Sequence, residues 1–137
     1  ILNETYVKKL QIEARIIGDM CLSQVIPAAV RYKNVLIENV KGLKKIFGDD
    51  YLSYCTSEMD ALKAISKYIN NMSADIELLV EARKKANRIE NLAQRAKEYS
   101  REVKDMMERV RERADNLEML IDNEMWPLPK YRELLFF

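Results

Sequence analysis

The sequence predicts an all-α fold of three long antiparallel helices, an up-down-up bundle with coiled-coil-like packing. Apolar residues recur at steps of three and four in three long stretches, which is the spacing of one helix face. The 137 residues include only three Gly and three Pro, and none of these lies between residues 49 and 126. We expect one helical-bundle domain, residues 1–137, and a chain opening on Ile1 rather than Met suggests a fragment of a larger protein.

The first helix is predicted from Glu4 to Phe47, roughly 65 Å at 1.5 Å per residue. Pro27 lacks a backbone N–H and its ring clashes with the carbonyl four residues back, so we expect one helix kinked near Ser23 to Ile26. Gly48 is expected to end it in a left-handed conformation. The predicted buried face comprises Val7, Leu10, Ala14, Ile17, Cys21, Val25, Ala28, Tyr32, Leu36, Val40, Leu43 and Phe47.

The second helix is predicted to begin at Ser57, after a connection in which aromatic residues cover the end of the bundle. Its apolar face comprises Leu62, Ile65, Ile69, Met72, Ile76, Leu79 and Ala86. No Gly or Pro marks its end. We place the reversal near Asn87 to Asn91, because asparagine tolerates turn conformations and few apolar residues occur there.

The third helix is predicted from Leu92 to about Met125. Its apolar face comprises Leu92, Ala96, Tyr99, Val103, Met106, Val110, Leu117, Leu120 and Ile121. Pro127 and Pro129 end it, since a residue before proline avoids helical geometry. Residues 131–137 are too apolar for a free tail, so we expect the C-terminal segment to pack back on the bundle or on another domain.

Composition excludes several functions. The net charge of +1 provides no field that would attract nucleic acid or an anionic membrane. The absence of histidine removes the commonest general base and metal ligand. No stretch is apolar enough to span a membrane. Cys21 and Cys55 are expected to be reduced, buried thiols of a cytoplasmic protein. We therefore predict no catalytic, cofactor-binding or metal-binding residue in this chain.

Two groups of charged residues are candidate sites. One is the set of helical carboxylates Glu77, Glu81, Asp115, Glu118 and Asp122, whose spacing suits a carboxylate-bridged metal centre; without histidine a solvated face is favoured. The other is a basic stretch, for which a charged turn at the bundle end is favoured over a phosphate or nucleic-acid site. It comprises Arg83, Lys84, Lys85, Arg88, Arg95 and Lys97.

Both ends of the chain resemble one family. Residues 114–118 read A-D-N-L-E, and residues 126–136 read W-P-L-P-K-Y-R-E-L-L-F. They look like the A-D-E-L-E segment and the W-P-x-P-x-Y-x-x-L-L-F run that end type III glutamine synthetases. Glu4–Lys8, Ile12–Arg15 and the Val25–Ala28 step resemble the start of that family's helical C-terminal region.

The resemblance implies a parent enzyme that joins ammonia to glutamate through γ-glutamyl phosphate, using ATP and Mg²⁺, in a large ring-shaped homo-oligomer. The family's catalytic core lies upstream, and none of its catalytic residues maps onto this chain. The expected role is therefore structural, with the catalytic core of the same polypeptide and neighbouring subunits as partners. The alternative is a free-standing three-helix interaction module or scaffold, which explains the apolar faces equally well but not the segment from Trp126 to Phe137.

Overall fold

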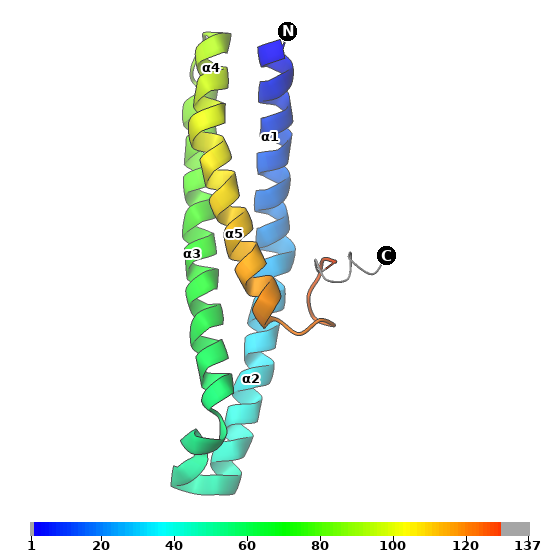
Figure 1. Cartoon of the computed structure of the whole chain (residues 1–137), viewed down its shortest axis with the longest axis vertical. Coiled ribbons are helices and arrows are strands. Elements are labelled where there is room, and N and C mark those ends of the chain that lie inside the picture. Colours follow the sequence, from blue (N-terminus) through cyan, green and yellow to red (C-terminus); the bar gives the residue numbers. More distant parts are fainter. Residues whose placement is uncertain (1, 130–137) are drawn as a thin grey trace.

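A computed structural model describes the backbone of residues 2–129 and the side chains from residue 4 onward. Three helical rods pack along one another, running up, down and up, as predicted (Figure 1). No strand occurs among these residues. The first rod consists of α1 (Leu2–Met20), η1 (Cys21–Val25) and α2 (Ile26–Phe47). The second rod is α3 (Thr56–Asn87). The third rod consists of α4 (Leu92–Glu98), η3 (Tyr99–Val103) and α5 (Lys104–Leu120).

The first rod is continuous across Pro27, and the predicted irregularity takes the form of the π-helical turn η1. The Ile26 N–H donates to the Cys21 carbonyl, five residues back. The wider turn lies directly before the proline, where an α-helix would meet the ring clash and lack a donor. The Ser23 hydroxyl donates to the Asp19 carbonyl at 2.6 Å, a bond that also favours bending.

The third rod departs from the prediction in two respects. A second π-helical turn, η3, adds a residue to one turn, so Met107 is buried where Met106 was expected. The helix also ends at Leu120 rather than near Met125, because Ile121 is extended with φ −84° and ψ 141°. The Asp122 carboxylate then accepts from the Glu124 N–H at 2.7 Å, and this Asx turn competes with further helix.

The connections follow the sequence signals closely. Gly48 ends α2 with a positive φ of 61°, as predicted, although its ψ of −133° lies outside the left-handed helical region. A 3₁₀ segment, η2 (Gly48–Tyr54), leads to α3, which begins at Thr56, one residue earlier than predicted. The second reversal lies at residues 88–91, where Asn91 caps α4 by accepting from the Gln94 N–H at 3.0 Å.

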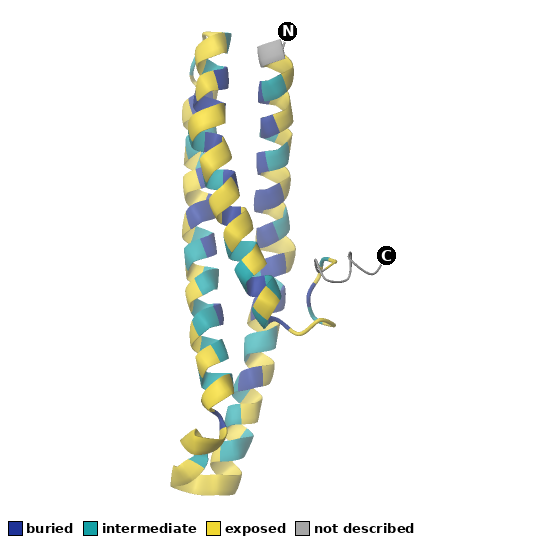
Figure 2. Cartoon of the chain, viewed as in Figure 1, coloured by how far each residue is buried: buried dark blue, intermediate teal, exposed yellow. Residues whose placement is uncertain are grey.

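The rods differ in length, so one end of the bundle has only two helices. The third rod ends beside the start of α2, and the later part of α2 continues with the first part of α3 as a two-helix arm (Figure 1). Residues 30–68 form this arm. Only Leu36, Cys55 and Ile65 are buried within it, whereas the three-helix part contains most of the core (Figure 2).

The cover that Tyr51, Leu52 and Tyr54 were predicted to give the end of the bundle is only partly present, since Tyr51 is half-buried and the other two are exposed. Phe47 is 39% exposed rather than buried, and its ring stacks on Tyr54 at a centroid distance of 3.9 Å. Leu52 and Tyr54 are more than half exposed. Further exposed apolar side chains on the arm are Val30, Val35 and Ile46.

The chain after α5 returns to the bundle as far as the structure describes it. Trp126 is buried to 8% exposure, and Leu128 packs against the core. The packing predicted for residues 131–137 concerns a segment that lies outside the described part of the chain.

Candidate functional site

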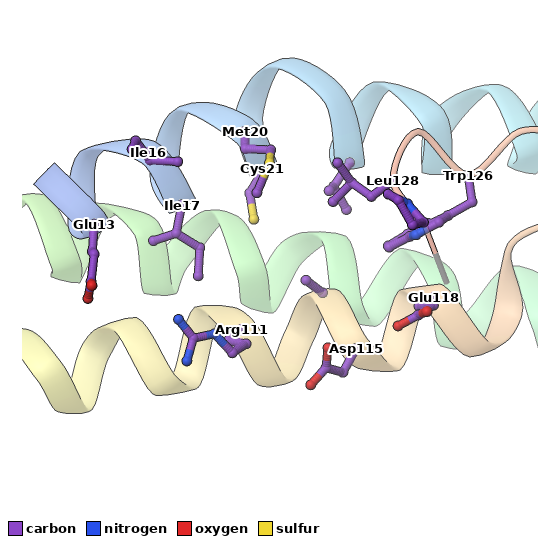
Figure 3. A pocket seen from close by; sticks show the side chains of 13 residues that line it. Glu13, Ile16, Ile17, Met20, Cys21, Arg111, Asp115, Glu118, Trp126 and Leu128 are labelled. Atoms are coloured by element: carbon purple, nitrogen blue, oxygen red, sulfur yellow. The ribbon is translucent and has the colours of Figure 1, made fainter. Parts of the chain in front are cut away.

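A groove of about 340 Å³ lies where the chain after α5 meets α1 and α5. Figure 3 shows Ile17 and Cys21 projecting from the first rod toward α5, with Trp126 and Leu128 lying next to each other beside them. The lining is largely apolar and comes from three segments far apart in sequence. Its apolar members are Ile16, Ile17, Met20, Cys21, Val25, Ala114, Trp126, Leu128 and Pro129.

The polar lining of the groove is mostly acidic. It consists of Glu13 from α1 and Arg111, Asp115 and Glu118 from α5. Partial burial raises the pKa of Asp115, the negative charges of Glu118 and Glu112 raise it further, and Arg111 opposes the shift. The groove therefore favours a positively charged group over an anion.

Two buried polar groups face this region without strong partners. The Trp126 indole Nε1–H is buried and has no hydrogen-bond acceptor among the described residues. Buried indole N–H groups usually find an acceptor, so this donor is an exception within the core. Burial also raises the pKa of the Cys21 thiol to about 11, which keeps it neutral and unreactive at physiological pH.

The helical carboxylates considered as a metal site lie apart from one another. Glu77 and Glu81 are exposed on α3, whereas Asp115 and Glu118 line the groove on α5. Asp122 lies beyond the end of α5 and takes part in the turn instead. Within residues 4–129, no group of three or more metal-ligating side chains is placed to hold an ion.

The basic stretch surrounds the turn between α3 and α4, as the favoured interpretation predicted. Arg95 Nε donates to the Ile89 carbonyl at 2.8 Å and so closes the turn. Lys85 lies 3.5 Å from Glu98, and Lys84 lies 4.0 Å from Glu81. The two lysines therefore pair with acidic residues of the same bundle.

An ion pair between the second and third rods was not foreseen. Arg113 Nε on α5 donates to Asp75 Oδ2 on α3 at 3.1 Å, and the Asp75 side chain is only 7% exposed. The sequence does contain the signal, because Asp75 falls on the same face as Met72, Ile76 and Leu79. An acid at a core position predicts a partner on a facing helix.

Comparison with known proteins decides the family. The model of the glutamine synthetase C-terminal domain matches residues 1–44. A glutamine synthetase of Bacteroides fragilis is 41% identical over 134 residues, which cover 97% of this chain and 18% of that protein. The chain belongs with the C-terminal domains of glutamine synthetases. The relatives thus confirm the resemblance that the two terminal motifs indicated.

More distant glutamine synthetases also align along nearly the entire domain. The type-3 glutamine synthetase of Dictyostelium discoideum is 26% identical over 99% of this chain, and a glutamine synthetase of Butyrivibrio fibrisolvens is 29% identical over 99%. The chain spans less than a fifth of the length of these relatives, 18% to 19%. None of the described helices is long and apolar enough to cross a membrane.

Proposed function

We propose that this domain is a non-catalytic, structural part of a glutamine synthetase. The whole polypeptide would ligate ammonia to glutamate with ATP and Mg²⁺, in the cytoplasm and as a large homo-oligomer. The names of the relatives and the small share of their length that the chain covers support this proposal. They favour it over the alternative, a free-standing scaffold, because the aligned relatives are several times longer.

The observation that carries the structural role is the two-helix arm. It extends beyond the third rod and carries exposed apolar side chains on α2 and on η2. An apolar surface at the end of a narrow projection is typical of a contact with another domain or subunit. The catalytic core of the same polypeptide or a neighbouring subunit is the partner that the proposal assigns to it.

The experiment uses the full-length synthetase. Val35, Ile46 and Leu52, which are 52%, 74% and 53% exposed, are each replaced by Glu. We expect either a lower particle mass by light scattering or a lower melting temperature of the assembled enzyme, with reduced glutamine formation. A lower mass would place the arm between subunits, and a lower melting temperature at constant mass would place it on the catalytic core.

The matched control places Glu at exposed apolar positions away from the arm. Leu78 and Met119 are 49% and 85% exposed and lie on α3 and α5. This variant should match the wild-type enzyme in mass, melting temperature and activity. A triple arm variant that also matches the wild type in all three would overturn the structural role.

A further inference from the structure

A second groove, of about 230 Å³, lies between α1 and α3 and shares no lining residue with the groove beside Trp126. Arg15 from α1 and Arg83 from α3 line it, and Asp19 is the one acid among the described residues of its wall. This space, called the Arg83 groove below, therefore carries more positive than negative charge.

Arg83 is placed in this groove without a hydrogen-bond partner for its Nε–H. That donor is buried and has no acceptor among the residues that the structure describes. Buried donors are usually paired, because leaving one unpaired costs free energy. Arg83 belongs by sequence to the basic stretch, but the ion pairs of Lys84 and Lys85 do not include it. Because no bond holds the Nε–H in place, a turn about the last side-chain torsions is enough to present it to a ligand.

Gly18 leaves room beside the two arginines. It lines the groove from α1, and a Cβ added at this position would meet nothing within 4 Å. A glycine in the middle of a helix is less favourable than alanine, because it loses more backbone freedom on folding. Close packing does not require a glycine here, and the missing side chain keeps the groove open.

We propose that the Arg83 groove binds a carboxylate that carries a short apolar group. Two arginines and one aspartate give the lining a net charge of +1, which one carboxylate neutralises. A phosphate group carries about −1.5 to −2 at pH 7 and would leave excess negative charge beside Asp19. The Nε–H and the adjacent Nη–H of an arginine match the two oxygens of a carboxylate. The proposal concerns the 137-residue chain alone and does not depend on the role proposed for the domain.

The remaining walls set the size and the polarity of this ligand. Leu22 is 51% exposed and Val80 is half-buried, whereas Ile76 and Leu79 are buried, so the wall offers apolar surface next to the charges. An apolar cavity of about 150 Å³ holds one benzene ring, so about 230 Å³ accommodates a group of about six to nine non-hydrogen atoms. Butyrate and the side chain of a glutamate residue both fit within this size.

Butyrate is the first probe, and the readout is the Arg83 Nε–H resonance in a ¹H–¹⁵N NMR spectrum of the 137-residue chain. We expect a saturable shift with a dissociation constant on the order of millimolar, as suits a ligand of so few atoms. Butyramide has the same shape without the charge and should bind about tenfold more weakly, because the charge-assisted bonds are lost. Inorganic phosphate at the same ionic strength should also bind more weakly. Absence of a saturable shift with butyrate, or equal binding of butyramide or phosphate, would overturn the proposal.

Two variants test the site from different walls, with the Leu22 backbone N–H as the resonance that all chains share. Arg83→Met removes the guanidinium, and Gly18→Leu places a side chain in the open space. Each should weaken butyrate binding by about tenfold or more. Gly18→Leu should melt no lower than the wild type, because leucine is the better helix former. Arg31→Met, at an exposed position of α2, is the matched control and should bind as the wild type does. Wild-type affinity in either groove variant would refute the assignment.

A peptide separates the two sources of such a carboxylate. Acetyl-Leu-Glu-Leu-amide has its only carboxylate on a side chain, and acetyl-Leu-Gln-Leu-amide is its uncharged control. If the glutamate peptide binds at least as tightly as butyrate and its control does not, the groove takes an acidic side chain of a polypeptide. If butyrate binds and the glutamate peptide does not, the ligand is a free organic acid. Failure of both to shift the Arg83 resonance would show that the groove is not a carboxylate site.

Discussion

The Asp75–Arg113 pair gives the sharpest test of how the second and third rods are held together. Arg113→Met keeps the aliphatic stem but leaves the Asp75 carboxylate, 7% exposed, without its cation. Breaking a fully buried ion pair costs about 3–5 kcal/mol. Because the Arg113 side chain is 26% exposed and water reaches it, we expect a loss below that range, about 2–3 kcal/mol.

The effect is measured by urea and thermal unfolding of the 137-residue chain, followed by circular dichroism at 222 nm. A domain of this size loses about 3–4 °C of melting temperature per kcal/mol, so Arg113→Met should melt about 6–12 °C lower. Asp75→Leu together with Arg113→Met should lose far less than the sum of the single changes, because the uncompensated charge is gone.

Two results would refute this reasoning. One is a loss below about 0.5 kcal/mol for Arg113→Met, which is the size expected of an exposed pair. The other is strict additivity in the double variant. Glu38→Gln provides the matched control, because its partner Lys41 lies 3.4 Å away and both side chains are about 70% exposed or more; it should change stability by less than about 0.5 kcal/mol.

Three further changes test other parts of the bundle. Asn87 accepts from the buried Tyr99 hydroxyl at 2.5 Å, so Asn87→Ala should lower the free energy of unfolding by about 1–3 kcal/mol, measured in urea. Asn91→Ala removes the cap on the Gln94 N–H and should cost about 1 kcal/mol in the same assay. Cys21 should resist a thiol reagent at pH 8 in the folded chain and react after unfolding, and its contribution to stability should decline between about pH 9 and 11, because the unfolded thiol ionises first. Alkylation of native Cys21 within minutes would contradict its burial.

Much of the bundle was predictable because helix periodicity records which face is buried. Eight of the predicted core positions of the first rod are buried, from Val7 to Leu36, and the reversal at Asn91 has the residue type that its cap requires. The prediction failed at Phe47, which lies on the correct face but beyond the reach of the third rod. Periodicity identifies a face, and it does not show how far the neighbouring helix extends.

The π-helical turns limit prediction in a different way. Each adds one residue to a turn, and the choice between Met106 and Met107 after the second depends on a backbone detail that side-chain spacing does not encode. Pro27 signals the first turn through its missing donor, and no comparable residue precedes the second. The candidate groove is the hardest part to predict from sequence, because its walls come from three separate segments whose relative positions depend on such backbone details.

The early end of α5 accounts for both the uncovered two-helix arm and the groove beside Trp126. The third rod, from Leu92 to Leu120, is roughly 44 Å long against roughly 70 Å for the first rod, which leaves the arm uncovered. The same end lets the chain turn at Asp122 and bring Trp126 back to Cys21. Had the helix continued to Met125, Trp126 would lie about one and a half turns further along the arm, and the groove would lose its aromatic wall. Residues 121–125 therefore set the division between a closed, three-helix part and an exposed, two-helix part.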